Sequence, residues 1–308
     1  MGKIAFLFPG QGAQYPGMGL DFFENYKCVR DLFAVAETIS PGITETCFYS
    51  SEDELMDTEN AQPCIFLVEA SILSVVSEFG ICADAVAGFS LGELTAVYHS
   101  GMFTFHRAFS AVLERARLMK ECTENIKGEM YAIIGLESDI VEDVVSKFEH
   151  TYAANFNTPK QTVVSTSLAS ADNLKNAVAS LGGRSVKLQV SGAFHTPFMN
   201  KASELFYRFL SEEELSLPKI PVYSNFTARP YTSNFAETLS KQINNPVRWW
   251  DTVINMCSGG VDTMIEIGPG KVLSSMISRN RKEVNVYNIS DISGLEKTLK
   301  DLGDLNAV

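Results

Sequence analysis

The sequence predicts an α/β protein with a mostly parallel sheet and a second, smaller α/β unit inserted into it. Short apolar runs typical of buried strands alternate with helical stretches along most of the 308 residues, which is the pattern of a parallel sheet covered on both faces. Between residues 128 and 190 this order changes. We therefore expect a core formed by residues 1-127 and 191-308, and a small subdomain formed by residues 128-190.

Composition is that of an ordinary folded domain and excludes several classes of function. Hydrophobic residues make up 45% and charged residues 20%, which argues against disorder. The net charge of −12 argues against a nucleic-acid-binding surface, because phosphate binding needs a basic face. The six cysteines are scattered without a C-x-x-C pair, so neither a zinc site nor a disulfide framework is indicated.

We expect a cytoplasmic protein that does not bind membranes. Scattered cysteines fit a reducing compartment, and the apolar run at the N-terminus is too short for a signal peptide. Glu69 and Glu78 interrupt the most apolar segment, which leaves no uncharged run of about 18 residues, the length that spans a bilayer.

The first expected strand, residues 4–8, ends in the glycine-rich turn Pro9-Gly-Gln-Gly-Ala-Gln14. Backbone N–H groups of such a turn could hold a ligand, although the turn lacks the nucleotide-binding motifs, and a plain loop is the alternative. Helical patterns follow at residues 22–39 and 63–79. The second is apolar nearly all round, which is typical of a helix buried against a sheet.

A strand, a sharp turn and a helix are expected between Asp84 and Tyr98, around the sequence Gly88-Phe-Ser-Leu-Gly92. This is the G-x-S-x-G pattern of a nucleophile elbow, in which the serine is forced toward positive φ and the glycines let the two arms pass closely. Ser90 would lie at a helix N-terminus, where unpaired N–H groups and the helix dipole favour negative charge. The alternative is a glycine-flanked surface turn.

The remaining elements define the small subdomain and complete the large sheet. After a helix at 104–122, the order strand, helix, strand, strand, helix, strand is typical of a ferredoxin-like split unit; its elements are expected at 130–134, 138–148, 152–155, 162–166, 171–181 and 185–190. Further strands of the large sheet are expected at 220–224, 263–267 and 284–289.

A nucleophilic serine needs a base, and the chain has four histidines. His99 would lie about 13 Å along the helix that Ser90 begins, at about 1.5 Å per residue, which is too far for a hydrogen bond. His106 lies farther along and His150 falls in a polar helix end. His195 follows an expected strand, where a parallel sheet presents its catalytic groups, so we interpret it as the base; an ordinary surface histidine is the alternative.

Five motifs occur in a fixed order along nearly the whole chain: Phe8-Pro-Gly-Gln-Gly-Ala-Gln14, Gly88-Phe-Ser-Leu-Gly-Glu93, Val190-Ser-Gly-Ala-Phe-His195, Gln242-Ile-Asn-Asn-Pro-Val-Arg-Trp249 and Glu266-Ile-Gly-Pro-Gly270. Together they resemble the malonyl-CoA:acyl carrier protein transacylases of fatty acid synthesis and the related acyltransferases of polyketide synthases. The resemblance implies an α/β hydrolase-like core with a ferredoxin-like insertion, in agreement with the order of elements.

The resemblance also implies a role for each matching residue. Ser90 corresponds to the acylated nucleophile and His195 to its base. Gln11 and Leu91 correspond to the residues whose backbone N–H groups form the oxyanion hole. Asn245 corresponds to the residue whose backbone carbonyl orients the histidine, so a Ser-His dyad replaces a triad.

Specificity for malonyl groups is implied by one arginine. Arg115 resembles the arginine that grips the malonyl carboxylate, and Arg117 on the same expected helix is the alternative. Phe89 departs from the family, which usually has histidine before the nucleophile. Ala193-Phe194 before the expected base resembles members that take malonyl units.

The activity implied by the resemblance is transfer of malonyl from malonyl-CoA, through a malonyl-serine, to the phosphopantetheine thiol of an acyl carrier protein, without a metal or a tightly bound cofactor. We expect a monomer that binds its acidic carrier through a local basic patch, with candidates Lys187, Lys201, Arg208 and residues 279–282. Two alternatives stay open: a serine esterase or thioesterase, and a silent module that only binds acyl carriers.

Overall fold

The computed structural model describes residues 2–124, 128–188, 192–212 and 215–306. Its contacts group the chain into two compact units. The first comprises residues 1–114, 215–223 and 255–308, and the second comprises residues 115–214 and 224–254. The chain passes from one unit to the other within helix α7 (Phe105–Glu124) and within helix α12 (Trp249–Ser258).

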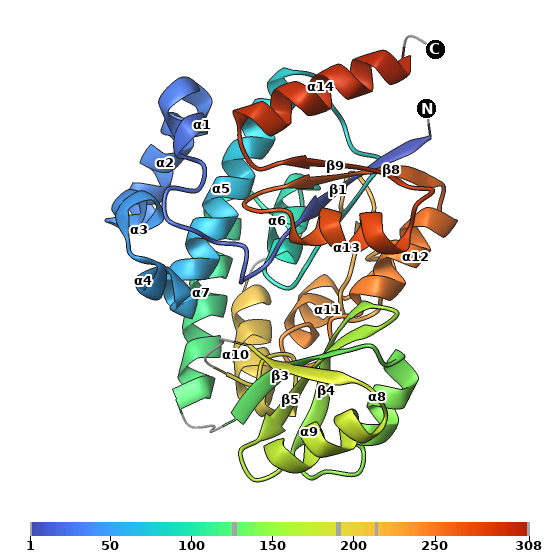
Figure 1. The fold of residues 1–308 in the computed structure, drawn as a ribbon. Helices are drawn as coiled ribbons and strands as arrows, with labels where there is room; N and C mark the ends of the chain where they lie inside the picture. The colour runs from blue at the N-terminus through green and yellow to red at the C-terminus, as the bar shows by residue number, and fades with distance from the viewer. Residues whose placement is uncertain (1, 125–127, 189–191, 213–214, 307–308) are drawn as a thin grey trace. The chain divides into compact units, whose positions relative to one another are not determined.

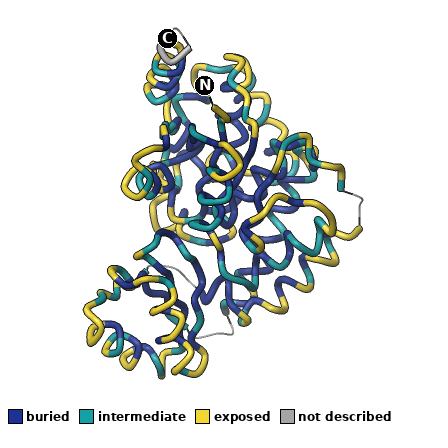
Figure 2. The backbone as a smooth tube through the Cα atoms, turned by 90° about the vertical axis from the view of Figure 1, so that its right-hand side faces the viewer, coloured by how far each residue is buried: buried dark blue, intermediate teal, exposed yellow. Residues whose placement is uncertain are grey.

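The first unit contains a five-stranded sheet in the order β7-β2-β1-β8-β9 (Figure 1). Each pair of neighbouring strands is parallel, which confirms the predicted sheet type. The strands are β1 (Lys3–Phe8), β2 (Ala85–Gly88), β7 (Val222–Tyr223), β8 (Val261–Ile267) and β9 (Asn285–Ile289). Most of β1 and all of β2 are buried. Figure 2 colours the backbone by burial, with buried residues in dark blue and exposed residues in yellow.

Helices cover this sheet because its central strands have apolar side chains on both faces. Helix α6 packs on β1 and β2, α5 on β8, and both α13 and α14 on β9. The helices of the first unit are α1 (Leu20–Asn25), α2 (Lys27–Ile39), α3 (Ile43–Tyr49), α4 (Glu52–Met56), α5 (Thr58–Glu78), α6 (Gly92–His99), α13 (Val272–Asn280) and α14 (Ile292–Asn306).

Helix α5 is long and apolar enough to cross a membrane by length and composition alone, and 83% of its most apolar window is buried inside the protein. It begins five residues before the predicted start at Pro63. The reason is the side chain of Asp57, which caps the helix by accepting a hydrogen bond from the Glu59 N–H at 2.9 Å. The predicted helix at 22–39 is instead two helices, because Tyr26 is extended at φ −118° and ψ 129°.

The second unit contains an antiparallel sheet in the order β4-β5-β3-β6. Its strands alternate with two helices in the predicted order: β3 (Gly128–Ile134), α8 (Ser138–Val145), β4 (Thr151–Thr158), β5 (Gln161–Ser167), α9 (Ala171–Ser180) and β6 (Arg184–Lys187). This is the ferredoxin-like arrangement, so the predicted subdomain fold is confirmed. Val141, Val144, Leu174 and Val178 of the two helices pack on Tyr131, Ile133 and Val164 of the sheet.

The predicted limits of the subdomain stay a prediction. Residues 125–127 and 189–191, which adjoin both limits and include the end of the predicted strand at 185–190, lie outside the described residues. The compact second unit is wider than 128–190. It also includes the short helix η1 (Pro197–Met199), α10 (Asn200–Leu210) and α11 (Phe235–Lys241).

Two carboxyl groups are buried together in the core of the first unit. Glu69 of α5 is fully buried and accepts a hydrogen bond from the Thr95 hydroxyl. Glu266, at the end of β8, accepts from the backbone N–H groups of Leu273 (3.0 Å) and Ser274 (2.8 Å), which begin α13. Burial raises the pKa of Glu69 well above its usual value, and the charge of Glu266 raises it further. We therefore expect Glu69 to be a neutral acid in the folded protein.

The Glu69→Gln variant should be more stable than the wild type at neutral and alkaline pH. An acid whose pKa is higher in the folded than in the unfolded state opposes folding above its unfolded pKa, and the opposition grows until the folded pKa is reached. The difference in free energy of unfolding between Glu69→Gln and the wild type should therefore increase from about pH 4 upward. Urea unfolding at several pH values measures it, with Glu78→Gln at the exposed end of the same helix as control. An equal pH dependence in both variants would contradict the assignment.

Candidate active site

The sharp turn at Ser90 has the geometry predicted for a nucleophile elbow. Strand β2 ends at Gly88, Ser90 has φ 53°, and α6 begins at Gly92. A Cβ on Gly88 would lie 1.8 Å from the carbonyl carbon of Gly92, and a Cβ on Gly92 would lie 2.1 Å from the carbonyl oxygen of Phe8. Both positions therefore require glycine, and the serine occupies the left-handed conformation between them.

The glycine-rich turn after β1 lies directly against this elbow. The Phe89 N–H donates to the Phe8 carbonyl at 2.8 Å, and a Cβ on Gly10 would lie 2.4 Å from the Phe89 carbonyl oxygen. The Gln11 side chain donates to the Thr58 hydroxyl at 3.3 Å, which ties the turn to the start of α5. Leu91, the N-cap residue of α6, is fully buried beside the serine. The oxyanion roles of Gln11 and Leu91 stay a prediction that this proximity supports.

His195 is held by two successive carbonyl groups of the second unit. Its backbone N–H donates to the Ile243 carbonyl at 3.1 Å, and its Nδ1 lies 2.8 Å from the Gln242 carbonyl oxygen. Because a carbonyl can only accept, Nδ1 carries the proton, and Nε2 of the neutral ring is the nitrogen that can accept one. The residue is 4% exposed and has φ 59°, a strained conformation like that of Ser90.

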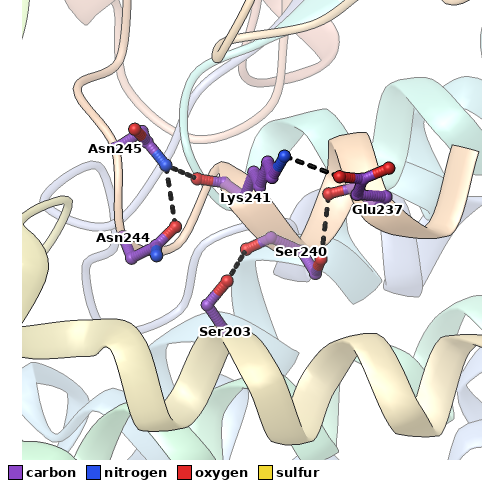
Figure 3. A network of polar contacts seen from close by, with 6 residues as sticks. All are labelled: Ser203, Glu237, Ser240, Lys241, Asn244 and Asn245. Atoms are coloured by element: carbon purple, nitrogen blue, oxygen red, sulfur yellow. Dashed lines mark hydrogen bonds and ion pairs between the residues drawn. The ribbon is translucent and has the colours of Figure 1, made fainter. Parts of the chain in front are cut away.

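The expected role of Asn245 is corrected: the carbonyl that orients the histidine belongs to Gln242. The helix α11 ends at Lys241, so the carbonyls that follow it are not used within the helix and can accept from other groups. The side chain of Asn245 folds back on this turn, donating to the Lys241 carbonyl at 2.9 Å and to the Asn244 side chain at 2.8 Å (Figure 3). Asn245 thus shapes the turn without orienting the ring.

Arg115 is buried in the same part of the second unit, and Arg117 is not. The Arg115 side chain is 1% exposed and donates from Nη2 to the Gln242 side chain oxygen at 2.8 Å. Arg117 is 45% exposed and pairs with Glu121 one turn along α7. Burial therefore favours Arg115 as the arginine of the site. Gln242 contacts both predicted residues, His195 through its backbone and Arg115 through its side chain.

The environment of His195 keeps its ring neutral. Burial, reinforced by the positive charge of Arg115, lowers the pKa of His195 to about 3, although the hydrogen bond to the Gln242 carbonyl acts in the opposite direction. The lowering wins because a charged imidazolium would lose its water and face a guanidinium. At physiological pH the ring is therefore in its unprotonated form, which is the form that a general base needs before it takes a proton.

The structure also places His99, and it bears on the presence of metal sites. The His99 ring packs on the rings of Phe6 and Phe8, with centroids 5.4 and 6.3 Å away, and is a core histidine. Among the residues that the structure describes, no group of three or more His, Cys, Asp and Glu side chains could hold a metal ion.

Each unit thus brings together part of the predicted set. The first contains Ser90, Leu91 and the turn with Gln11, and the second contains His195 and Arg115. Sequence reasoning missed Gln242 as the residue that holds both side chains. The sequence signal for Gln242 was its position as the first residue of the motif at 242–249, which also contains Asn245.

Comparisons with known proteins agree on one family. The model of the acyl transferase domain matches residues 5–307. A curated malonyl CoA-acyl carrier protein transacylase of Bacillus subtilis is 34% identical, with 99% of each chain covered. The crystal structure of a malonyl CoA-acyl carrier protein transacylase from Clostridium perfringens has a TM-score of 0.95 and 33% identity, covering 99% of this chain and 98% of that one.

A second similar structure is a complex. It contains a type II polyketide synthase acyl-carrier protein with its malonyl-transacylase, and the matching chain has a TM-score of 0.93 and 29% identity, covering 97% of this chain and 99% of that one.

His195 should remain neutral at pH 5, where an ordinary histidine with a pKa near 6.5 is almost fully charged. Between pH 6.5 and pH 3 the ring binds a proton in the unfolded chain but not in the folded protein. Protonation therefore favours the unfolded chain, and the free energy of unfolding falls as the pH drops through this range. Titration of the ring 15N shifts by NMR, with the signal assigned by its loss in His195→Gln, measures the pKa. Arg115→Ala should raise it. A ring that becomes charged near pH 6.5 in the wild type would contradict this environment.

Proposed function

Because the chain belongs to the acyltransferase family that the acyl transferase domain defines, we propose that it transfers a malonyl group from malonyl-CoA to an acyl carrier protein. The relatives carry this activity in their names, and one of them forms a complex with an acyl-carrier protein. The transfer supplies extender units for fatty acid or polyketide synthesis. The observation that carries the proposal is the Gln242 contact with both a buried neutral His195 and a buried Arg115.

In the first half-reaction the Ser90 oxygen attacks the thioester carbonyl of malonyl-CoA while His195 takes the serine proton on Nε2. The tetrahedral oxyanion accepts hydrogen bonds from the backbone N–H groups of Gln11 and Leu91, each worth about 2.7–4 kcal/mol in comparable sites. The carbon–sulfur bond then breaks, His195 returns the proton to the sulfur, and CoA leaves a malonyl-serine ester. This mechanism requires His195 to reach the Ser90 hydroxyl in the working enzyme.

The second half-reaction is the reverse, with a different thiol. His195 takes the proton of the phosphopantetheine thiol, the sulfur attacks the malonyl-serine, and Ser90 leaves with the proton. The Gln242 carbonyl fixes the ring tautomer through both halves, so the same nitrogen exchanges each proton.

Arg115 supports selection of malonyl over uncharged acyl groups. A malonyl thioester ends in a carboxylate, which an apolar pocket would bind only at a large desolvation cost. A buried guanidinium can offset that cost with two parallel hydrogen bonds, and Gln242 already orients one of its Nη atoms.

Carrier binding, compartment and assembly complete the proposal. We propose a cytoplasmic monomer that needs no metal or tightly bound cofactor. Among the candidate docking residues, Lys187 and Arg208 are each paired with a carboxylate. Lys201, Arg279 and Lys282 make no ion pair with another described residue, which favours them as contacts for an acidic carrier.

The two alternatives differ from transfer in their products. A serine esterase or thioesterase would release CoA rapidly without an acceptor, because water would reach the acyl-serine. A silent carrier-binding module would release none under any condition. Release of CoA from malonyl-CoA, measured with and without a phosphopantetheinylated carrier protein, tests the function directly. Transfer predicts at most one CoA per enzyme without the carrier and continuous release with it.

Ser90→Ala should abolish formation of the acyl-enzyme, and His195→Ala should slow it by several orders of magnitude without unfolding the protein. The two side chains act as one unit, so the double variant should be hardly slower than either single variant. Single-turnover acylation with labelled malonyl-CoA gives the rates. Losses that multiply in the double variant would show that the two residues act independently.

Arg115→Ala should reduce kcat/KM for malonyl-CoA by roughly 30- to several-thousand-fold, the cost of truncating one member of a buried charged pair. The constant for acetyl-CoA should be unchanged or higher, because acetyl has no carboxylate. Arg115→Lys should rescue only in part, since lysine has the charge without the planar fork.

Arg117→Ala is the matched control for this comparison, because it removes an exposed arginine from the same helix. Selective loss of malonyl transfer in Arg117→Ala instead would assign the carboxylate to the other arginine. Loss in neither variant would mean that other residues hold it.

A further inference from the structure

A polar groove of about 580 Å³ lies in the first unit, along the last strand of its sheet. The strand β9 is at the edge of the sheet, and in Figure 1 it lies between α13 and α14. Both helices and the strand contribute to the groove wall. The volume is in the range that binds small ligands, and none of the predicted catalytic residues lines it.

Three cationic side chains line this groove without neutralising partners. They are Lys271 before α13, Arg279 near the end of α13, and Lys297 in α14. Within the described residues, none of the three side chains makes an ion pair or a hydrogen bond. In a chain with net charge −12, carboxylates are abundant, so three unpaired cations around one concavity indicate a site for an external anion.

Two carboxylates, Asp291 and Asp301, also line the groove, so its three cations leave a net charge of +1. Asp291 is committed to the start of α14, where it accepts from the Gly294 N–H at 2.7 Å and from the Ser290 hydroxyl at 3.2 Å. Asp301 lies near Tyr287, whose pKa is raised first by burial and then by the Asp301 charge. No ion pair joins either carboxylate to a described cation of the groove.

Hydroxyl groups occupy much of the remaining wall. Ser275 and Ser278 come from α13, Ser293 and Thr298 from α14, and Tyr287 from β9. Each hydroxyl can donate one hydrogen bond. The strand β9 is the edge of the described sheet, so its outer row of N–H groups has no strand partner.

We propose that this groove binds a phosphate group of a small molecule. A phosphate presents several strong acceptor oxygens and up to two negative charges, which match separated cations set among hydroxyl donors. The guanidinium of Arg279 can make paired hydrogen bonds to it, and Lys271 and Lys297 supply point charges. Two sources have this chemistry: a free inorganic or organic phosphate, and the phosphorylated nucleotide end of a coenzyme.

Isothermal titration at low ionic strength tests the proposal without any measurement of acyl transfer, so it is independent of the proposed function. The probes are inorganic pyrophosphate and adenosine 3′,5′-bisphosphate, which carries phosphates on a nucleotide but no thiol arm. We expect the wild type to bind at least one probe. Arg279→Ala and Lys297→Ala should each weaken that binding about tenfold or more, and added salt should weaken it in all proteins.

Lys300→Ala is the matched control, because Lys300 is an exposed lysine of the same helix α14 that does not line the groove. It should change the affinity by less than about twofold. Binding of pyrophosphate would show that a free phosphate is sufficient for binding to the groove. Binding of the bisphosphate alone would show that the nucleotide end of a coenzyme is required. Both outcomes support the site. No binding of either probe, or a loss of affinity in Lys300→Ala equal to that in Arg279→Ala and Lys297→Ala, would overturn it.

Discussion

The close approach of three backbone segments around Ser90 is the constraint on which the first unit depends. Strand β1, strand β2 and the start of α6 meet where a Cβ on Gly88 or Gly92 would lie within 2.1 Å of another backbone atom. Because the segments meet, the turn after β1 is pressed against the elbow and the serine is driven to φ 53°. The strain of a non-glycine residue in this conformation, of order 1–3 kcal/mol, is borne by the packed core around it.

The second unit holds the expected base, His195, near the cation Arg115 while the His195 ring stays neutral. Gln242 does this with two groups of one residue, a backbone carbonyl for the His195 ring and a side chain oxygen for Arg115. The Gln242 carbonyl favours the imidazolium, whereas burial and the guanidinium oppose it, and the opposing effects are larger. A substrate carboxylate bound to Arg115 would reduce its positive field, so binding and basicity are coupled through this residue.

The sequence predicted the nucleophile elbow correctly because the spacing of Gly88 and Gly92 reflects the close approach of the backbone at this turn. It reached the subdomain fold because periodicity separates strands from helices. The role of Asn245 was implied by the resemblance, and it was wrong. Which carbonyl of this turn faces the ring depends on where α11 ends, and the sequence pattern does not specify a helix end to the residue. It also gave no sign that Glu69 and Glu266 are buried together, because contacts between residues far apart in sequence leave no local pattern. The second unit is also wider than the expected subdomain at 128–190, because it is defined by contacts between residues far apart in sequence.

The central claim is that Ser90 carries the malonyl group between two thiols. Mass spectrometry of the intact protein after acid quenching, followed by peptide mapping, tests it most directly. Incubation with malonyl-CoA should add one malonyl group, located on the peptide that contains Ser90, and addition of a phosphopantetheinylated carrier protein before quenching should remove it and malonylate the carrier. An adduct on another residue, or an adduct that the carrier cannot remove, would contradict the account.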